Sequence, residues 1–582
     1  MSDLIKESDL SNALQLEKLH MKIFAPALMK LLKLKKLNKA IEENEHLKGV
    51  EFVDHFLKQL KVEYEIDAED LKNIPLNNSF IALANHPYGG IDGLILLSIF
   101  LKARPDFKVS ANYLLQRIES VKENFIPVNP FENDKDKGKS ISGLKKLLRH
   151  VKESPVGIFP AGEVSSIKFS RLKVLDKSWN PIVGKIIKKS EADVLPVFFS
   201  GNNSLIFNLL GLLNPNFRTA KLPSELFNKK QKVKVRIGKI ISNKSISDFK
   251  DSDDMLNFLR AKTYALGTGI EVKKNFRATL KSISKPKAVI PAIDKNSLAS
   301  EICTLKKTAL LFSHQQYEIY ICAATQIPYC LKEISRLREI AYREVGEGTN
   351  RSFDSDAFDA YYKHLFIWDS KAQCIVGAYR LGLGDELFAV FGKKGFYLNQ
   401  LFKIQKEFNP YLQKSIELGR SFVTKEYQRK PLSLLLLWKG INEFLKKNPD
   451  RFKYMIGPVS ISNSFSSLSK DLLVAYIRHN HYDRKLSKLI KARKKFKYKF
   501  KGEEGKSLIK KHSDDIKKLD NFISEIETTH LKIPVLIKKY LKLNAKIVSF
   551  NIDPKFNDSL DGFLILEIDQ IPEKAFDMLI KN

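Results

Sequence analysis

Short apolar runs separated by helix-like segments fill residues 79–245 of the chain. Runs of about four to eight residues rich in β-branched and aromatic side chains and bounded by glycine, proline or asparagine are typical of strands. Between them, residues 140–153 and 181–190 have apolar positions at helical spacing. This alternation predicts an α/β layer with a mostly parallel sheet. The predicted strands are SFIALAN, FKVSAN, VGIFPAG, DVLPVFFSG and KVKVRIGKII.

The pattern changes in the second half, where strand-like and helix-like segments are mixed rather than alternating. Helical spacing predicts helices at 329–343 and 431–447. The mixed order predicts an α+β domain. Its predicted strands are YEIYICAA (317–324), HLFIWD (364–369), its hairpin partner CIVGAYRLG (374–382), SIELGRSFV (415–423), YMIGPVSIS (454–462) and FLILEI (563–568).

The N-terminal segment 17–43 places leucine, isoleucine and alanine at spacings of three and four residues, with many lysines between them. This pattern predicts a basic amphipathic helix with a possible break at Pro26. Such a helix either packs on the first domain or lies on an anionic membrane surface. The divisions expected along the chain are a basic helical region at 1–50, an α/β domain at 51–271, a linker at 272–300 and an α+β domain at 301–582.

A formal charge of +33 in 582 residues gives much of the surface a positive field, which attracts nucleic acid, anionic lipid or an acidic protein. No aromatic-basic RNA signature or zinc-finger spacing occurs, so nucleic-acid binding is only a remote alternative. The four cysteines form no C-x-x-C pair, which indicates a reducing, cytoplasmic setting without a metal site. No apolar run reaches the roughly 18 residues needed to span a bilayer. We therefore expect peripheral contact with the inner face of the cytoplasmic membrane.

The most basic stretch is residues 478–511, RHNHYDRKLSKLIKARKKFKYKFKGEEGKSLIKK. A charge run of this kind is either a solvated surface or a docking site for an acidic carrier protein or lipid headgroups. The sequence alone leaves both interpretations open.

The stretch ANHPYGGIDGLILLSIF (84–100) places His86 and Asp92 on either side of a glycine-rich turn that follows a predicted strand. Ligand sites of α/β folds lie at this end of the strands. A carboxylate bonded to one imidazole nitrogen makes the other nitrogen a better base, able to take a proton from an alcohol. Alternatively, Asp92 serves only as the N-cap of the following helix, and His86 is an ordinary turn residue.

Downstream blocks extend this pattern: GIFPAGEVSS (157–166) and LPVFFSGNNS (195–204). Together with NHPYGGIDG they resemble the glycerophosphate and lysophospholipid acyltransferases, and most closely the hemolysin-like subgroup, over residues 60–270. The resemblance implies a glycerolipid-acyltransferase-like α/β fold in which His86, held by Asp92, deprotonates an acceptor hydroxyl. It implies that Glu163 positions the acceptor, and that the turn residues Asn85, Gly89 and Gly90 bind substrate, with backbone N–H groups stabilising the oxyanion.

Three departures from the family pattern affect the expected acceptor. Five residues, rather than four, separate His86 from Asp92, and the acid of F-P-E-G has moved to Glu163. The second block, NFIPVNP (124–130), lacks the arginine that the family usually keeps for phosphate. The resemblance therefore implies an acceptor without a phosphate group.

The second half, over residues 315–570, resembles GNAT-type (acyl-CoA N-acyltransferase-like) enzymes that make ornithine lipids, which are distant relatives of acyl-homoserine-lactone synthases. The segments that carry this resemblance are 341–369, 375–382, 415–441, 457–462 and 540–568. Because Glu417 and Arg420 are three residues apart in a predicted strand, we expect them to face different neighbours. By the resemblance, both are catalytic, and Asp356, Asp359 and Arg380 bind the substrate.

The usual acetyl-CoA loop of GNAT folds is absent, since residues 428–433 read QRKPLS. An acyl carrier protein, acidic and bearing a phosphopantetheine arm, suits the basic chain better than CoA as the donor. No bound cofactor is expected.

The two resemblances together imply a bifunctional acyltransferase of aminolipid synthesis. The second half would N-acylate an amino acid, ornithine or glycine, with a 3-hydroxyacyl chain, and the first half would O-acylate the 3-hydroxyl. The alternative is a single acyltransferase activity, with the other half serving as a docking module.

Overall fold

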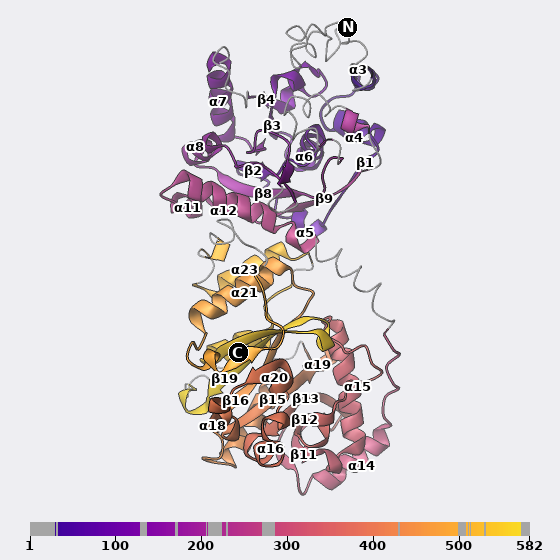
Figure 1. Ribbon diagram of the computed structural model, residues 1–582. Coiled ribbons are helices and arrows are strands. Elements are labelled where there is room, and N and C mark those ends of the chain that lie inside the picture. The colour runs from indigo at the N-terminus through magenta and orange to yellow at the C-terminus, as the bar shows by residue number, and fades with distance from the viewer. Residues whose placement is uncertain are drawn as a thin grey trace. The chain divides into compact units, whose positions relative to one another are not determined.

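The computed structural model describes residues 30, 33–128, 137–168, 173–204, 207, 224–227, 231–270, 286–428, 431–498, 508–509, 511, 514–528 and 531–571. It divides into two compact units, residues 1–270 with 501–508 and residues 271–500 with 509–582 (Figure 1). Most of the predicted N-terminal amphipathic helix lies outside the described residues. Its last part forms helix α3, Leu34–Glu42, which buries Leu34, Leu37 and Ala40.

The N-terminal unit contains a seven-stranded sheet with the order β1-β9-β8-β2-β5-β3-β4. Every neighbouring pair is parallel except β8 with β9, which confirms the predicted, mostly parallel α/β layer. The strands are β1 Val62–Ile66, β2 Phe80–Ala84, β3 Lys108–Ala111, β4 Phe125–Pro127, β5 Val156–Ile158, β8 Asp193–Phe199 and β9 Gln231–Ile237.

Helices cover both faces of this sheet, α4 and α6 on one side and α7, α8 and α12 on the other (Figure 1). Alternate strand residues point to opposite faces, so Phe80, Ala82 and Ala84 of β2 join the core beneath α4 and α6. All five residues of β2 are buried, as expected for a central strand covered on both faces. The helices are α4 Gly49–Gln59, α5 Ala68–Leu71, α6 Gly90–Ala103, α7 Lys137–Val151, α8 Pro181–Ser190, α11 Asn243–Ser247 and α12 Ser252–Ala265.

The C-terminal unit contains an eight-stranded sheet with the order β10-β11-β12-β13-β15-β16-β19-β18. All neighbouring pairs are antiparallel except β15 with β16, which confirms the predicted α+β class. The strands are β10 Leu310–His314, β11 Tyr317–Ala323, β12 Lys363–Asp369, β13 Cys374–Leu383, β15 Ser415–Val423, β16 Tyr454–Ile461, β18 Lys546–Asp553 and β19 Ser559–Glu567.

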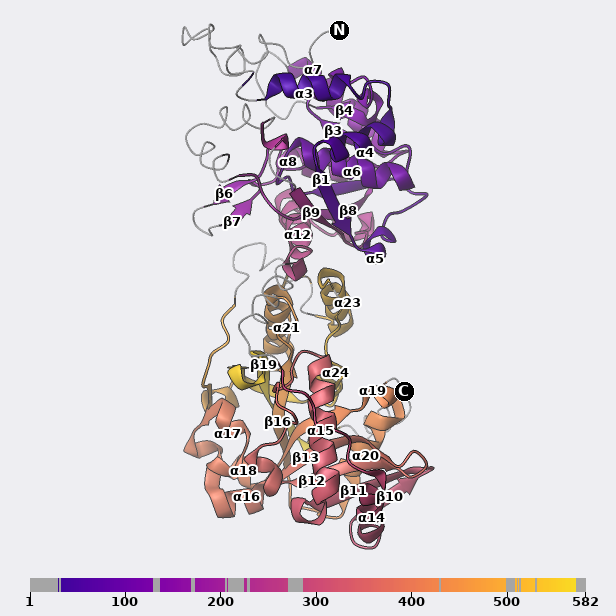
Figure 2. The ribbon, with the colours of Figure 1, turned by 90° about the vertical axis from the view of Figure 1, so that its right-hand side faces the viewer.

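Two long helices pack on opposite faces of this sheet. Helix α15, Pro328–Glu344, packs against β13 and β15, and Figure 2 shows it crossing in front of these strands. Helix α20, Pro431–Lys446, packs on the strands from β10 to β13 from the other side. The other helices are α14 Lys295–Leu305, α16 Gly384–Phe391, α17 Leu398–Leu401, α18 Asn409–Gln413, α19 Lys425–Gln428, α21 Ser467–Asn480, α23 Ile516–Ile526 and α24 Val535–Lys542.

Strands β15 and β16 pair over only three residues, Ser415–Glu417 with Tyr454–Ile456. Beyond this point the ladder stops, although both strands continue. Gly457 sits against the neighbouring strand there, since a Cβ added to it would lie 2.2 Å from the carbonyl oxygen of Leu418. The parallel ladder therefore ends at Glu417, although the two backbones stay close at Gly457.

The structure differs from the expected linker at its C-terminal end. Residues 286–294 carry no regular structure, but α14 begins at Lys295, five residues before the expected boundary at 300. Asp294 caps this helix through a hydrogen bond from the backbone N–H of Ser297 at 3.0 Å, and Leu298 and Ile302 join the core of the second unit. The serine-rich composition that suggested a linker thus includes a helix start.

Among the described residues, no helix is long and apolar enough to cross a membrane. Within the same residues, no group of histidine, cysteine or acidic side chains has the arrangement of a metal site.

Candidate active sites

His86 lies in the turn between the end of β2 at Ala84 and the start of α6 at Gly90. Its Nδ1 is 3.1 Å from Oδ2 of Asp92, with 18% of the His86 side chain exposed and Asp92 fully buried. The two atoms are at contact distance without being aligned as a hydrogen bond. Before substrate binds, catalytic pairs often have such loose geometry. The imidazole also stacks on Phe159, with ring centroids 4.1 Å apart.

Asp92 holds the turn closed while it contacts the imidazole. Its Oδ2 accepts hydrogen bonds from the backbone N–H groups of Tyr88 at 2.8 Å and Gly89 at 3.0 Å. Burial raises the pKa of Asp92, and the contact with His86 and the two N–H donors oppose this rise. Helix α6 begins at Gly90, so Asp92 stands in its first turn and is not its N-cap. The same carboxylate therefore serves the helix start and the histidine.

The two turn glycines have different roles. Gly89 has φ +79°, a conformation that costs little only for glycine, and its N–H donates to Asp92. That N–H thus holds the Asp92 carboxylate, and a substrate-binding role for Gly89 stays a prediction. Gly90 is the first residue of α6, and a Cβ added there would meet nothing within 4 Å, so the space beside it is open.

Asp176, which the sequence analysis missed, fixes the backbone of His86. Its Oδ1 accepts hydrogen bonds from the N–H of His86 at 3.2 Å and from Oγ of Ser165 at 2.5 Å, and its Oδ2 accepts one from Nε1 of Trp179. The N–H of Ser165 donates to the carbonyl of His86 at 2.8 Å. Ser165 belongs to the quoted FPAGEVS block, so this block positions the histidine. Asp176 itself lies in no block.

Asn85 and Glu163 are tied to neighbouring groups. Asn85 exchanges two hydrogen bonds with the backbone of Phe199, donating through Nδ2 at 2.9 Å and accepting through Oδ1 at 2.7 Å. It therefore connects the ends of β2 and β8. Glu163 forms an ion pair with Lys177 at 2.5 Å, and 19% of its side chain is exposed. Its role in acceptor positioning stays a prediction.

In the C-terminal unit, three arginines and three aspartates form a mostly buried charge network. The structure brings together the predicted Asp356, Asp359, Arg380 and Arg420 and adds two residues that the sequence analysis missed. These are Arg338 on α15, 1% exposed, and Asp354 in the following loop, 2% exposed. The six formal charges cancel, which is how proteins tolerate buried ions.

Each arginine bridges two carboxylates. Arg338 contacts Asp354 at 2.7 Å through Nε and Asp359 at 2.9 Å through Nη2. Arg380 contacts Asp356 at 2.5 Å and Asp359 at 3.0 Å through Nη1. Arg420 lies 3.2 Å from Asp356 and 3.6 Å from Asp354. With 23% of its side chain exposed, Asp356 is the most accessible of the carboxylates.

A β-bulge aims Arg420 into the network. The pairing of β13 with β15 shifts between Arg380 opposite Gly419 and Ala378 opposite Phe422, and Arg420 has φ +51°. A bulge redirects a side chain, and a strained non-glycine residue at a bulge often marks a functional site. The guanidinium lies 5.1 Å from the ring centroid of Tyr397 and 5.3 Å from that of Phe556.

Glu417 serves different neighbours from Arg420, as the three-residue spacing predicted. Its carboxylate accepts hydrogen bonds from the Tyr362 hydroxyl and from the backbone N–H groups of Tyr397 at 3.0 Å and Leu398 at 2.7 Å. The residue is 1% exposed, and burial raises its pKa, opposed first by the bond from Tyr362. These contacts anchor the start of α17. A catalytic role for Glu417 stays a prediction.

The arginines keep Asp356 and Asp359 ionised. Burial by itself would raise the pKa values of Asp356 and Asp359. Arg380 and Arg420 nevertheless hold the pKa of Asp356 below its usual value, and Arg338 and Arg380 do the same for Asp359. Nε2 of His364 donates a hydrogen bond to the carbonyl of Asp359 at 2.9 Å, and burial lowers the pKa of His364 to about 4. A neutral histidine therefore borders the ionised Asp359 at pH 7.

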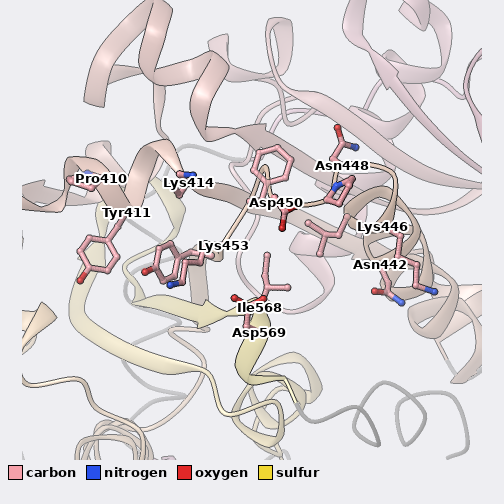
Figure 3. Close-up of a pocket in the computed structure, with 14 residues that line it drawn as sticks. Pro410, Tyr411, Lys414, Asn442, Lys446, Asn448, Asp450, Lys453, Ile568 and Asp569 are labelled. Carbon is pink, nitrogen blue, oxygen red and sulfur yellow. The ribbon is translucent and has the colours of Figure 1, made fainter.

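A cavity of about 730 Å³ opens elsewhere in the C-terminal unit, where the chain enters β15 and β16 beside the end of α20. Figure 3 shows Lys414 and Lys453 on one side of it and Lys446 on the other. Asp450 and Asp569 also line it, so its charges are mixed. None of the predicted site residues lines this cavity.

Comparison with known proteins assigns both units. Residues 17–272 match the family described as "Acyltransferase", and residues 337–439 match "Acetyltransferase (GNAT) domain". A glycine N(alpha)-acyltransferase of Phocaeicola vulgatus is 31% identical over 305 residues, covering 49% of this chain and 90% of that protein. The chain belongs to the family of this acyltransferase. It is an acyltransferase of lipid biosynthesis in which an acyltransferase domain precedes a GNAT domain.

A second relative from the same organism, a lyso-glycine lipid O-acyltransferase, is 25% identical over 240 residues, covering 40% of this chain and 82% of that protein. The crystal structure of the 1-acyl-sn-glycerophosphate (LPA) acyltransferase PlsC from Thermotoga maritima covers 47% of this chain and 95% of that chain, at 17% identity and a TM-score of 0.26. That structural similarity is weak. The predicted order of an α/β acyltransferase domain followed by a GNAT domain is confirmed by the two family matches and the sheets described above.

Proposed function

We propose that the chain carries out both acylations of an aminolipid. The GNAT domain joins a 3-hydroxyacyl chain to the α-nitrogen of glycine, and the acyltransferase domain then esterifies the 3-hydroxyl with a second fatty acid. The observation that carries this proposal is the fusion itself. One chain is similar both to a glycine N(alpha)-acyltransferase and to a lyso-glycine lipid O-acyltransferase.

The acyltransferase domain has the groups that O-acylation requires. Asp92 orients His86 at the open end of β2, and Asp176 with Ser165 fixes the histidine backbone. An imidazole held in this way takes the proton of an alcohol as the oxygen attacks an acyl thioester. The absence of a phosphate-binding arginine in NFIPVNP favours an acceptor such as an N-acylated amino acid.

The GNAT domain has a rigid, charge-balanced network of three arginines and three aspartates. Among these six residues, Asp356 is the one with appreciable exposure, which makes it the group that an incoming acceptor reaches first. Glycine is preferred to ornithine as the acceptor because the relatives named above act on glycine or its lipid.

Acyl carrier protein is the proposed donor for both reactions. The described part of the basic stretch, residues 478–498, offers lysines and arginines to an acidic carrier, and the chain as a whole has a charge of +33. The same positive charge would hold the enzyme at an anionic membrane surface, where its lipid product is released.

The proposal is tested with the purified full chain and defined donors. Isotope-labelled glycine and 3-hydroxypalmitoyl carrier protein are expected to give N-acylglycine, and adding palmitoyl carrier protein is expected to give the two-chain lipid. Parallel reactions with ornithine, and with CoA thioesters, measure the preference for acceptor and donor. Failure to acylate any amino acid while O-acylation proceeds would reduce the GNAT domain to a docking module.

A further inference from the structure

Beside the arginine network, the GNAT domain has a group of carboxylates without counter-charges. Within the described residues, Glu347, Asp553 and Asp561 form no ion pair. The side chain of Glu347 has no hydrogen-bond partner there either. The two hydrogen bonds to Asp561 come from hydroxyls, Ser460 at 2.6 Å and Ser559 at 3.3 Å, and both reach Oδ1. The group is therefore complementary to a cation that the protein does not supply.

The loop that carries Glu347 is fixed on both sides. It begins at the C-terminal end of α15, where Gly346 has φ +76° and the N–H of Glu347 donates to the carbonyl of Tyr342 at 2.8 Å. Ser462 donates to the carbonyl of Val345 at 2.8 Å, and Asn557 donates to that of Gly346 at 2.7 Å. Glu347 is thus held in place by residues following β16 and β18.

The same region adjoins Arg420. Tyr397 stacks against this guanidinium, and its hydroxyl lies 3.4 Å from Oδ2 of Asp553. The charges of Arg420, Asp553 and Asp561 all act on the Tyr397 hydroxyl, so two of the three carboxylates and the arginine network meet at this ring. Tyr342 lies one turn after Arg338 on α15, and the charges of both Glu347 and Arg420 act on its hydroxyl.

Burial raises the pKa of Glu347 to about 7. Burial also raises the pKa of Asp561 to about 8, with further increases from the charges of Asp553 and Glu347. A base works best when its pKa is near the working pH, because it is then largely unprotonated yet still basic enough to accept a proton. Asp356 and Asp359, whose pKa values are lowered, are too weakly basic for this task.

Building on the proposed function, we propose that Glu347 is the general base of N-acylation. The acceptor's ammonium would lie between Glu347 and Asp561, with Tyr397 and Arg420 on the side of the network. Placing the cation there supplies the missing counter-charge of the group.

The step balances as follows. Glu347 takes one proton from the α-ammonium, and the free amine attacks the thioester carbonyl, forming the C–N bond. The C–S bond then breaks, and the departing thiolate takes the second proton lost from nitrogen, leaving a neutral amide. Glu347 releases its proton to solvent, so each turnover yields one amide, one thiol and one proton.

The test compares the full-length wild-type chain with Glu347→Gln, using 3-hydroxypalmitoyl carrier protein and glycine from pH 5.5 to 9. We expect kcat at pH 7 to fall on the order of 10²–10³-fold, with little change in the KM of glycine. In the wild-type chain, kcat/KM for glycine should rise with pH to a plateau above about 7, the pKa of Glu347 in the free enzyme. The variant should lose this rise and recover partly at high pH, where more amine is free.

Two variants separate catalysis from structure. Glu344→Gln removes an exposed carboxylate from the same helix end, paired with Lys425 at 3.4 Å, and should keep the wild-type rate and pH profile. Glu347→Asp keeps a carboxylate and should restore part of the rate. An unchanged kcat for Glu347→Gln would overturn the assignment. A Glu347→Gln variant in which the KM of ornithine rises and nothing else changes would overturn it as well. If the wild-type chain acylates no amino acid, the proposed function fails instead.

Discussion

Asp92 and His86 are joined across a turn whose backbone the same aspartate closes: Oδ2 lies 3.1 Å from Nδ1 and also accepts the N–H groups of Tyr88 and Gly89. A substitution can therefore keep the turn and change only the electrostatics. Asparagine offers an oxygen to the two N–H groups but no negative charge to an imidazolium.

Asp92→Asn is expected to lower kcat for O-acylation on the order of 10²–10⁴-fold, because the imidazolium formed on proton transfer loses its counter-ion. N-acylation by the GNAT domain should be unaffected. Steady-state assays of both reactions on one preparation check this. Glu119→Gln, which changes an exposed carboxylate paired with Lys122, is the control and should leave both rates unchanged. Equal rates for Asp92→Asn and wild type would remove Asp92 from the mechanism.

Asp176→Ala is expected to lower the free energy of unfolding of the N-terminal unit by about 1–3 kcal/mol, because buried donors on His86, Ser165 and Trp179 lose their acceptor. O-acylation should fall more than tenfold, since His86 loses one of its two backbone anchors. Urea unfolding and steady-state kinetics measure the two effects. Ser165→Ala should have a smaller effect, because its N–H still donates to His86. A larger effect of Ser165→Ala would contradict this ranking.

The arginine network makes the GNAT domain sensitive to acid. The pKa values of Asp356 and Asp359 are lower in the folded state than the unfolded value of about 3.9, so their contribution to stability is present above that pH and lost as the pH falls below it. Asp359→Asn should cost about 3–5 kcal/mol at pH 7, because Arg338 and Arg380 lose a buried partner. Hydrogen exchange of this domain from pH 2 to 7 should show both effects, with the loss of stability confined to the acid end of this range. If the stability of Asp359→Asn and of the wild-type chain changed equally with pH, Asp359 would not be a source of the acid sensitivity.

Arg420→Lys is expected to reduce N-acylation at least about tenfold, because a single ammonium cannot reproduce the contacts of a guanidinium with Asp354 and Asp356. Arg451→Lys is the matched control, since Arg451 pairs with Asp385 and Glu386 at the surface. Its N-acylation rate should stay at the wild-type value. The measurement is the rate of N-acylation of labelled glycine by the wild-type chain, Arg420→Lys and Arg451→Lys.

Much of the fold could be predicted because strands and helices leave regular local patterns. Helix α8 was predicted with its observed bounds, and all five predicted strands of the first half occur, with β5 shorter than expected. The bulge at Arg420 could not be predicted, since strand alternation assumes regular pairing and the positive φ arises from tertiary contacts. The helix start at Lys295 was hidden by a composition typical of linkers.

The contacts within the candidate sites were predicted only where their residues share a recognisable block. His86 and Asp92 lie six positions apart, so the local sequence carries their relationship. Asp176 reaches His86 across 90 positions, and Arg338 reaches Asp359 from a separate helix, so folding alone brings these pairs together. Glu347 gave no signal either, because its chemistry depends on burial and missing partners rather than on residue type.

The most direct measurement is the lipid profile of a bacterial host without aminolipids that expresses the wild-type chain or His86→Ala. We predict that wild type yields a two-chain, phosphorus-free glycine lipid, whereas His86→Ala accumulates the N-acylated lyso-lipid at a comparable molar amount. Mass spectrometry of total lipid extracts resolves both products. Two-chain lipid at wild-type levels from His86→Ala would contradict the division of labour between the two domains.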